Sequence, residues 1–149
     1  LQIANLMCAI ANVGHYITPH VNKCDSLKKK IHYCKVDKKY YPIVFEAMWR
    51  VFDSGTAAAS KIPGIDMCGK TGTADNSHGK PHSILVGFAP RVHPKIAVAV
   101  VVENAGYGSM FAAPIFSLLV EQYLKGKIER TALLEKTQNT VTNSYVKER

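Results

Sequence analysis

The sequence has no long apolar run, no closely spaced cysteine pair and no internal repeat. Its longest wholly apolar stretch, Ile96 to Val102, has seven residues, whereas a membrane-spanning helix needs roughly 20. The four cysteines form no C-x-x-C pair, which argues against a disulfide-rich scaffold and a standard zinc finger. We therefore expect these residues themselves to be soluble and globular.

The chain also lacks an initiating methionine. It begins at Leu1, and helical periodicity is already present from Gln2 to Asn12, so we expect a fragment of a longer protein. Its 149 residues, 47% of them hydrophobic, suit one domain with its own core. We predict that residues 1–126 form the domain and that residues 127–149 form a polar tail.

Acidic residues are few. Nineteen Lys and Arg against eleven Asp and Glu give a net charge of +8, which suits an anionic membrane, a wall polymer or nucleic acid. Tyr40 and Tyr41 follow two lysines, but no nucleic-acid-binding motif surrounds them. We therefore expect an ordinary solvated surface and no nucleic-acid partner.

The apolar pattern predicts an α/β (α+β) fold in which an antiparallel sheet packs between helices. The predicted helices cover Gln2 to Asn12, Pro42 to Phe52, and Ala112 to Tyr123. The middle helix is apolar on two sides, so we expect it to be buried centrally. Two strand-like pieces within Tyr16 to Val36 predict a β-ribbon. Strands are predicted at Ile65 to Thr73, Ser83 to Ala89 and Lys95 to Glu103, with short turns typical of a meander.

One stretch, "GIDMCGKTGTAD", matches two motifs. Gly64 and Gly69-Lys70-Thr71 fit the phosphate-loop pattern, while Lys70-Thr71-Gly72-Thr73 fits the K-T-G-T signature of penicillin-recognising acyl transferases. A phosphate loop needs a buried strand before it and a helix directly after it. Two glycines and a proline follow Thr71, so nucleotide binding is the less favoured alternative.

Acyl transfer from a peptide that ends in a carboxylate needs groups that hold the carboxylate and N–H donors for the oxyanion. Lys70, Thr71 and Thr73 can supply the first set, and the backbone N–H of Thr73 can supply one donor. Gly72 has no side chain, so it permits close approach of a substrate backbone. These four residues form the predicted substrate-binding site.

The order of segments around this motif is more specific than the motif. The segments are "CGKTGTAD", "HGKPHSILVGFAP", "PKIAVAVVVENAGYG" and "AAPIFSLLVEQYL". In this order they resemble the C-terminal part of the transpeptidase domain of class B penicillin-binding proteins, above all the elongation-type penicillin-binding protein 2 family. "LQIANLMCAIANVGHYITPH" is similar to the segment upstream of the K-T-G strand in that family.

The resemblance implies a penicillin-binding-protein/serine β-lactamase-like fold with a five-stranded sheet. It implies a peptidoglycan D,D-transpeptidase that cross-links stem peptides through an acyl-serine and binds β-lactams without a cofactor or metal. It also implies a parent anchored in the cytoplasmic membrane, with this domain in the periplasm or outside, that works with a cell-elongation glycosyltransferase complex. Alternatives are a serine β-lactamase, a D,D-carboxypeptidase and a non-catalytic β-lactam sensor.

Two of the three signatures of this class are not evident. No S-x-N triplet occurs, and Ser26-Leu27-Lys28-Lys29 spells S-x-x-K within a charged, turn-like segment. We interpret Ser26 as a surface residue and predict that the catalytic serine and its lysine are missing. Loss of a nucleophile costs on the order of a millionfold in rate, so the isolated chain is predicted to be inactive.

Further polar residues have weaker signals. Asn76, His78, His82 and Ser83 follow the K-T-G strand, where side chains can line the mouth of a cleft, and Tyr107 lies in a glycine-rich turn. We assign none of them a catalytic role. His20, Cys24, His32 and Cys34 are plausible zinc ligands by type, but their spacing matches no standard site, so we predict no metal.

Overall fold

The main sheet is an antiparallel meander of three strands. The structure, a computed structural model, describes residues 1–21 and 30–146. Strands β3 (Cys68–Ala74), β4 (His82–Ala89) and β5 (Ile96–Val102) lie in the order β3-β4-β5, with Thr71 opposite Leu85 and Leu85 opposite Val100. The predicted meander is confirmed. Strand β3 starts at Cys68 rather than Ile65, because Ile65 forms an isolated antiparallel bridge with Ile62.

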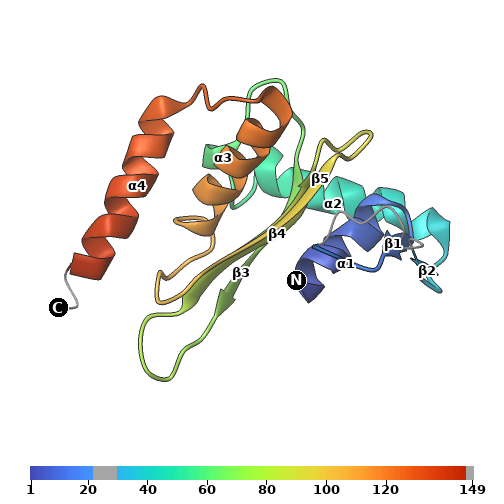
Figure 1. Cartoon of the computed structure of the whole chain (residues 1–149), viewed down its shortest axis with the longest axis horizontal. Helices are drawn as coiled ribbons and strands as arrows, with labels where there is room; N and C mark the ends of the chain where they lie inside the picture. The colour runs from blue at the N-terminus through green and yellow to red at the C-terminus, as the bar shows by residue number, and fades with distance from the viewer. Residues whose placement is uncertain (22–29, 147–149) are drawn as a thin grey trace.

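Helices cover both faces of this sheet (Figure 1). Helix α3 (Ala112–Lys125) covers one face, where Phe116 stacks with Phe52 at 5.4 Å and both rings are buried. Helix α1 (Gln2–Ala11) covers the other face, where Met7 packs in a cluster with Cys68 and Phe88. The predicted mixed α/β architecture, an antiparallel sheet between helices, is therefore confirmed. The described part of the main sheet holds three strands, where the family resemblance implied five.

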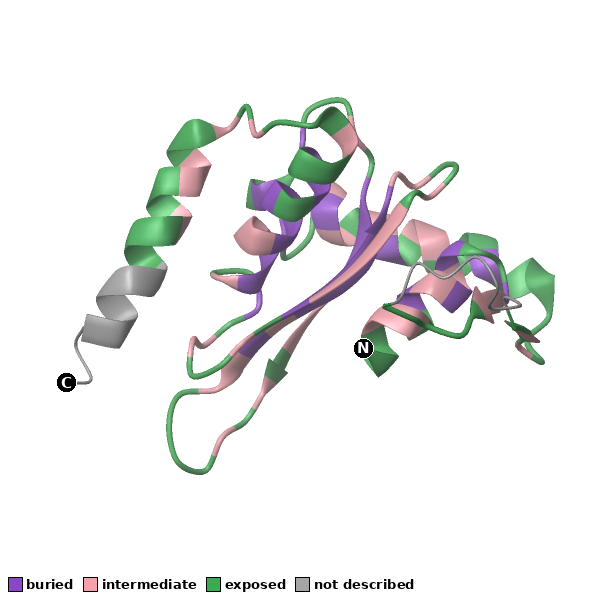
Figure 2. Ribbon diagram, viewed as in Figure 1, coloured by how far each residue is buried: buried purple, intermediate pink, exposed green. Residues whose placement is uncertain are grey.

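Helix α2 (Tyr41–Asp53) differs from its prediction. It begins with Pro42 in its first turn, as expected, and it buries Met48 and Phe52. The predicted apolar stripe of Val44, Ala47, Met48 and Val51 is partly open, because Val44 and Ala47 are exposed. The prediction that this helix is buried centrally is therefore wrong for the described residues. Helix α2 packs against β3 along one side only. Figure 2 shows the alternation of buried and exposed residues along it.

A small ribbon precedes α2. Strands β1 (His15–Ile17) and β2 (Ile31–Tyr33) pair antiparallel, with Tyr16 opposite His32, and their rings stack at 4.9 Å. This confirms the predicted β-ribbon apart from the main sheet. Ser26 and Cys24, which the sequence analysis considered as a nucleophile and a metal ligand, lie outside the described residues.

Residues after α3 form a helix that the sequence analysis did not predict. Gly126 ends α3 with a left-handed φ of 75°, as a C-terminal glycine should. Helix α4 (Thr131–Val146) then runs beside the β5–α3 turn and α3 (Figure 1). A polar tail was predicted from Lys127 onward, but α4 half-buries Leu133, Leu134 and Thr137.

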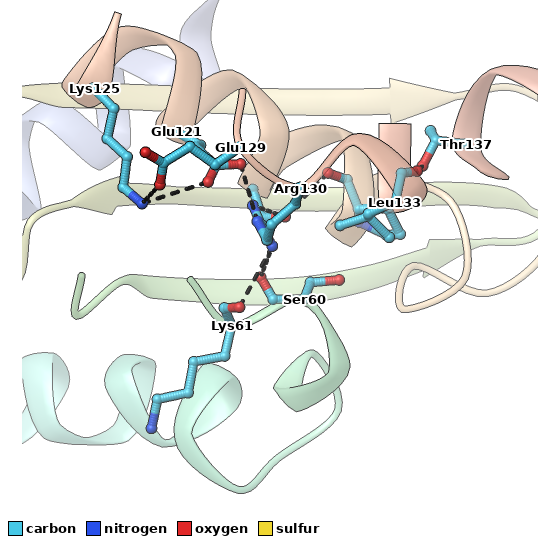
Figure 3. Close-up of polar contacts among 10 residues, drawn as sticks. Ser60, Lys61, Glu121, Lys125, Glu129, Arg130, Leu133 and Thr137 are labelled. Atoms are coloured by element: carbon cyan, nitrogen blue, oxygen red, sulfur yellow. Dashed lines mark hydrogen bonds and ion pairs between the residues drawn. The ribbon is translucent and has the colours of Figure 1, made fainter. Parts of the chain in front are cut away.

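Arg130 fastens the start of α4 to the domain (Figure 3). Its Nε donates to Oε2 of Glu121 at 3.0 Å, and its Nη2 donates to Oγ of Ser117 at 3.1 Å. Its Nη1 lies 3.3 Å from the carbonyl oxygen of Ser60. The Glu121 side chain is 1% exposed, and a buried carboxylate requires such a partner. One arginine thus joins α4, α3 and the segment before β3.

No helix in residues 1–21 and 30–146 is long and apolar enough to cross a membrane.

Candidate active-site strand

The four predicted site residues lie within an edge strand. Strand β3 pairs only with β4 among the described strands, so its other edge carries backbone groups without a strand partner. Side chains alternate along a strand. Lys70 and Gly72 therefore project to the face that Cys68 shares, and Thr71 and Thr73 project to the opposite face. Lys70 and Thr73 are exposed, and Thr71 is half-buried.

Contacts of Lys70 indicate which backbone groups face the free edge. Its ammonium Nζ donates to the carbonyl oxygen of Thr71 at 2.6 Å. In an antiparallel pair, the N–H and C=O of one residue point to the same side. Because a side chain reaches the carbonyl of Thr71, we infer that this residue presents its backbone outward. Thr73, two residues further on, then presents its N–H and C=O to the same edge.

The turn that follows β5 packs against the backbone of Gly72. A Cβ atom on Gly108 would lie 2.7 Å from the carbonyl oxygen of Gly72 and 2.5 Å from that of Ile84. Real Cβ atoms do not approach so closely, so this turn can lie against β3 and β4 only with glycine at this position. The glycine-rich turn around Tyr107, expected from the sequence, thereby supports the strand at the centre of the motif.

The hydroxyl of Thr71 has a partner that the sequence analysis missed. Thr56 follows α2, and its Oγ1 lies 3.0 Å from Oγ1 of Thr71. The two residues are 15 positions apart, and no motif or periodic pattern links them. Only the tertiary structure identifies this pair.

The loop between β3 and β4 is tied to the turn after β5. Nδ2 of Asn76 donates to Oδ1 of Asn104 at 2.6 Å, and the backbone N–H of Asn104 donates to Nδ1 of His82 at 3.1 Å. His78 donates its backbone N–H to Oδ1 of Asn76. Three of the residues predicted to lie near the cleft thus take part in one polar network beside the free end of β3.

Ser83 was placed wrongly. It was expected near the mouth of the cleft, but it is fully buried. Its hydroxyl donates to the carbonyl oxygen of Tyr107 at 3.0 Å and accepts from the backbone N–H of Ala112 at 3.1 Å. A helix N-terminus has N–H groups without helical partners, so the role of Ser83 is to bind the start of α3.

Two further matches to S-x-x-K, Ser77-His78-Gly79-Lys80 and Ser144-Tyr145-Val146-Lys147, were not considered in the sequence analysis, and Lys147 lies outside the described residues. Ser77-His78-Gly79-Lys80 lies in the exposed β3–β4 loop, and the Ser77 hydroxyl pairs with Nδ1 of its neighbour His78 at 2.8 Å. Serine and lysine approach each other across one turn of a helix, whereas Ser77 to Lys80 form a turn and a bend. This segment therefore lacks the geometry of a serine–lysine pair.

In two of the described cysteines, Cys68 and Cys8, burial disfavours the reactive thiolate. Burial raises the pKa of the Cys68 thiol from 9.0 to about 12, and its Sγ lies 3.6 Å from the carbonyl oxygen of Phe45. Burial also raises the pKa of Cys8. Residues 1–21 and 30–146 contain no group of three His, Cys, Asp or Glu side chains that could hold a metal ion. In the ribbon, Nε2 of His32 lies 2.9 Å from the Thr18 hydroxyl.

The phosphate-loop interpretation does not fit this geometry. The strand continues through Thr71 to Ala74, and the chain then forms a loop and the next strand. No helix begins directly after Thr71, so the N-terminal dipole and amides that would bind a phosphate are not at that position. The structure leaves K-T-G-T as the interpretation of this stretch.

Comparison with known proteins agrees with this geometry. Residues 1–121 match the model of the penicillin binding protein transpeptidase domain. The peptidoglycan D,D-transpeptidase MrdA of Acinetobacter baumannii is 32% identical, covering 78% of this chain and 21% of that relative. The peptidoglycan D,D-transpeptidase PbpA of Mycobacterium tuberculosis is 41% identical over 44% of this chain and 15% of that relative.

Solved structures show the same fold. Penicillin-binding protein 2 of Pseudomonas aeruginosa, in complex with WCK 5153, has a TM-score of 0.70 at 32% identity, covering 87% of this chain and 31% of that one. The imipenem acyl-enzyme of penicillin-binding protein A from M. tuberculosis has a TM-score of 0.69 at 30% identity, covering 81% and 29%. The chain belongs to the penicillin-binding protein transpeptidase domain family. It spans about a fifth of the length of the curated relatives it matches.

Proposed function

We propose that this chain forms one wall of the active site of a peptidoglycan D,D-transpeptidase whose acylated serine lies outside these 149 residues. The observation that carries the proposal is a K-T-G-T sequence on an edge strand with a free side, in a chain of the transpeptidase family. A substrate peptide can bind along such an edge, because the strand offers unpaired backbone donors and acceptors.

Each of the four motif residues has a proposed role. Thr71 and Thr73 hold the carboxylate of the peptide through two hydroxyls on one face of β3, and Lys70, whose Nζ reaches the outward carbonyl oxygen of Thr71 at the free edge, adds a positive charge. The backbone N–H of Thr73 faces the free edge, where it donates to the oxyanion that forms during acyl transfer. Gly72 keeps the strand free of side-chain bulk at the position where the substrate passes. Lys70 has no carboxylate partner among the described residues and donates only to a backbone carbonyl.

The proposed reaction has two steps. The serine hydroxyl attacks the carbonyl of the penultimate D-alanine, an ester forms, and the terminal D-alanine leaves with the proton. An amine of a neighbouring stem peptide then attacks the ester, forms the cross-linking amide and returns the proton to the serine. A β-lactam enters at the first step, but its opened ring stays attached, so the ester persists.

The substrate polymer suggests the location and partners of the full-length protein. Peptidoglycan lies outside the cytoplasmic membrane, so we propose a membrane-anchored protein with this domain in the periplasm or outside. A cross-linking enzyme needs newly polymerised glycan strands, which suits assembly with a cell-elongation glycosyltransferase. The support for this is the family and the chemistry of the substrate.

The test uses the full-length protein with a stem pentapeptide and an amine acceptor, followed by mass spectrometry. A D,D-transpeptidase produces cross-linked dimer together with free D-alanine, and the Lys70→Ala variant should lose most of this product. Free D-alanine without dimer would indicate a D,D-carboxypeptidase instead. Rapid, repeated hydrolysis of penicillin would indicate a β-lactamase, and stable acylation without any peptide product would indicate a sensor.

A further inference from the structure

A pair of hydroxyls next to the motif suggests a role for Thr56, a residue outside K-T-G-T. Oγ1 of Thr56 lies 3.0 Å from Oγ1 of Thr71, and either atom can donate. The half-buried Thr71 lies on β3, whereas the exposed Thr56 follows the end of α2. The Thr56 hydroxyl has no other hydrogen bond to the described part of the chain.

The backbone on either side of Thr56 is fixed by the end of α2. Gly55 donates its N–H to the carbonyl oxygen of Arg50 at 2.8 Å, and Ala57 donates to that of Val51 at 2.9 Å. A Cβ on Gly55 would lie 2.8 Å from the Arg50 oxygen, so this tight turn requires glycine. Ala57 is 1% exposed. Thr56 is therefore held between two anchored residues, and its hydroxyl has a defined position relative to β3.

The chemistry of a carboxylate decides the direction of the hydrogen bond. An ionised carboxylate only accepts hydrogen bonds, so the Thr71 hydroxyl must give its single proton to the ligand. Thr71 then accepts from Thr56, and Thr56 is the donor. In such a chain each hydrogen bond polarises the next and strengthens it. In the opposite direction, Thr71 would donate its proton to Thr56 and would have none left to donate to the carboxylate.

We propose that Thr56 is a positioning residue that orients the Thr71 hydroxyl toward the carboxylate of a stem peptide or a β-lactam. This inference rests on the proposed function, because Thr71 must hold that carboxylate. Thr56 acts through Thr71 and does not itself touch the ligand. Its hydrogen bond also selects one χ1 rotamer of Thr71, a β-branched residue with few rotamers to choose from.

The test compares two forms of one penicillin on the full-length protein, the free acid and its methyl ester. Thr56→Val keeps the shape of the side chain and removes the hydroxyl, while Thr56→Ser keeps the hydroxyl. We expect Thr56→Val to lower the acylation rate constant for the free acid about fivefold, the order of one hydrogen bond. The ester should react at an unchanged rate, and Thr56→Ser should restore the free acid to within about twofold.

A double-mutant cycle separates positioning from a general structural effect. In a Thr71→Val background, Thr56→Val should have no further effect on the free acid. Equal losses for acid and ester, additive losses in the cycle, or no loss at all would each overturn the role of Thr56. If Thr56→Val does not fold, Thr56→Ala, which adds no bulk, replaces it in the same comparison. No acylation of the unsubstituted protein by either compound would instead contradict the proposed function, and with it this inference.

Discussion

The side-chain amide of Asn76 donates a 2.6 Å hydrogen bond to the side-chain oxygen of Asn104. This bond joins the β3–β4 loop to the turn after β5. A second contact, from the backbone N–H of Asn104 to His82, lies beside it. The loop next to the free end of the K-T-G-T strand is therefore held by a small polar network.

Removing this bond should loosen the loop. Asn76→Ala removes this bond and the one that Oδ1 of Asn76 accepts from the backbone N–H of His78, and we expect the loss of these two exposed bonds together to cost about 1 kcal/mol of local stability. Hydrogen exchange of residues 75–81, measured by mass spectrometry on the full-length protein, should become about fivefold faster. Ser77→Ala is the matched control in the same loop, because the Ser77 hydroxyl pairs only with its neighbour His78. Equal acceleration in both variants would contradict a specific role for Asn76.

The close approach of Gly108 to Gly72 predicts a larger effect on acylation. A methyl group at Gly108 would collide with the carbonyl oxygens of Gly72 and Ile84, so the Gly108→Ala variant must move the turn or the strand. Displacement of catalytic geometry by about 1 Å can cost about 100-fold, and we expect penicillin acylation to fall at least tenfold.

The matched control for that variant is Gly106→Ala in the same turn. Gly106 also has a left-handed φ, of 86°, but nothing lies within 4 Å of a Cβ at this position. Backbone strain of about 1 kcal/mol is then the only expected cost, and acylation should remain within about twofold. Similar losses in both variants would show that the turn, rather than its contact with Gly72, matters.

We expect Arg130 to be required for the packing of α4 against the rest of the domain. Arg130→Met leaves the buried carboxylate of Glu121 without its closest partner, since Nζ of Lys125 is 3.6 Å away. Breaking a buried pair in this way costs about 3–5 kcal/mol. We expect rapid hydrogen exchange in α4 and loss of penicillin binding at a lower temperature.

Lys127→Met is the matched control for Arg130. It also removes one positive charge, but the Lys127 side chain is 73% exposed and its pair with Glu129 spans 3.4 Å. Exposed pairs contribute about 0–1 kcal/mol, so its thermal inactivation should scarcely change. Equal effects of the two substitutions would contradict the proposed fastening of α4.

The Cys68 thiol should resist alkylation in the folded protein. Burial raises its pKa from 9.0 to about 12, and a thiol must ionise to react. The folded protein keeps this proton as the pH rises, while the unfolded chain releases it above about pH 9. The contribution of Cys68 to stability is therefore complete below pH 9 and declines toward pH 12.

The measurement for Cys68 is alkylation by iodoacetamide at pH 8, read by mass spectrometry of each cysteine peptide. Cys34 is only partly buried and serves as the internal reference for an accessible thiol. We expect Cys34 to be modified in the native protein and Cys68 to react only in denaturant. Equal rates for both thiols would contradict the buried position of Cys68.

The K-T-G-T strand could be located from the sequence, but the residues that pack against it and hydrogen-bond to it could not. Lys70 to Thr73 could be placed on a strand because apolar runs and turn residues flank a short segment, which is local information. Ser83 was misplaced because burial of a hydroxyl depends on where α3 begins, 29 residues later. The contacts of Thr56 with Thr71 and of Gly108 with Gly72 join distant segments, and no periodic pattern encodes them.

Helix α4 could not be predicted from the sequence for a similar reason. Residues 127–149 are polar enough to suggest a tail, and helix propensity is a weak guide when few apolar residues mark a face. The structure half-buries Leu133 and Leu134 and places Arg130 on the buried carboxylate of Glu121. Since Glu121 lies on the preceding helix, its need for a partner could not be seen from the tail alone.

The central claim is that this chain supplies the K-T-G-T wall for a serine that lies elsewhere in the full-length protein. The most direct measurement labels that protein with a fluorescent penicillin and locates the acylated residue by peptide mass spectrometry. The account predicts one acylated serine outside these 149 residues, and weak labelling in the Lys70→Ala variant. Acylation of any serine within these 149 residues, such as Ser26, Ser77 or Ser144 of the S-x-x-K matches, or undiminished labelling without Lys70, would contradict it.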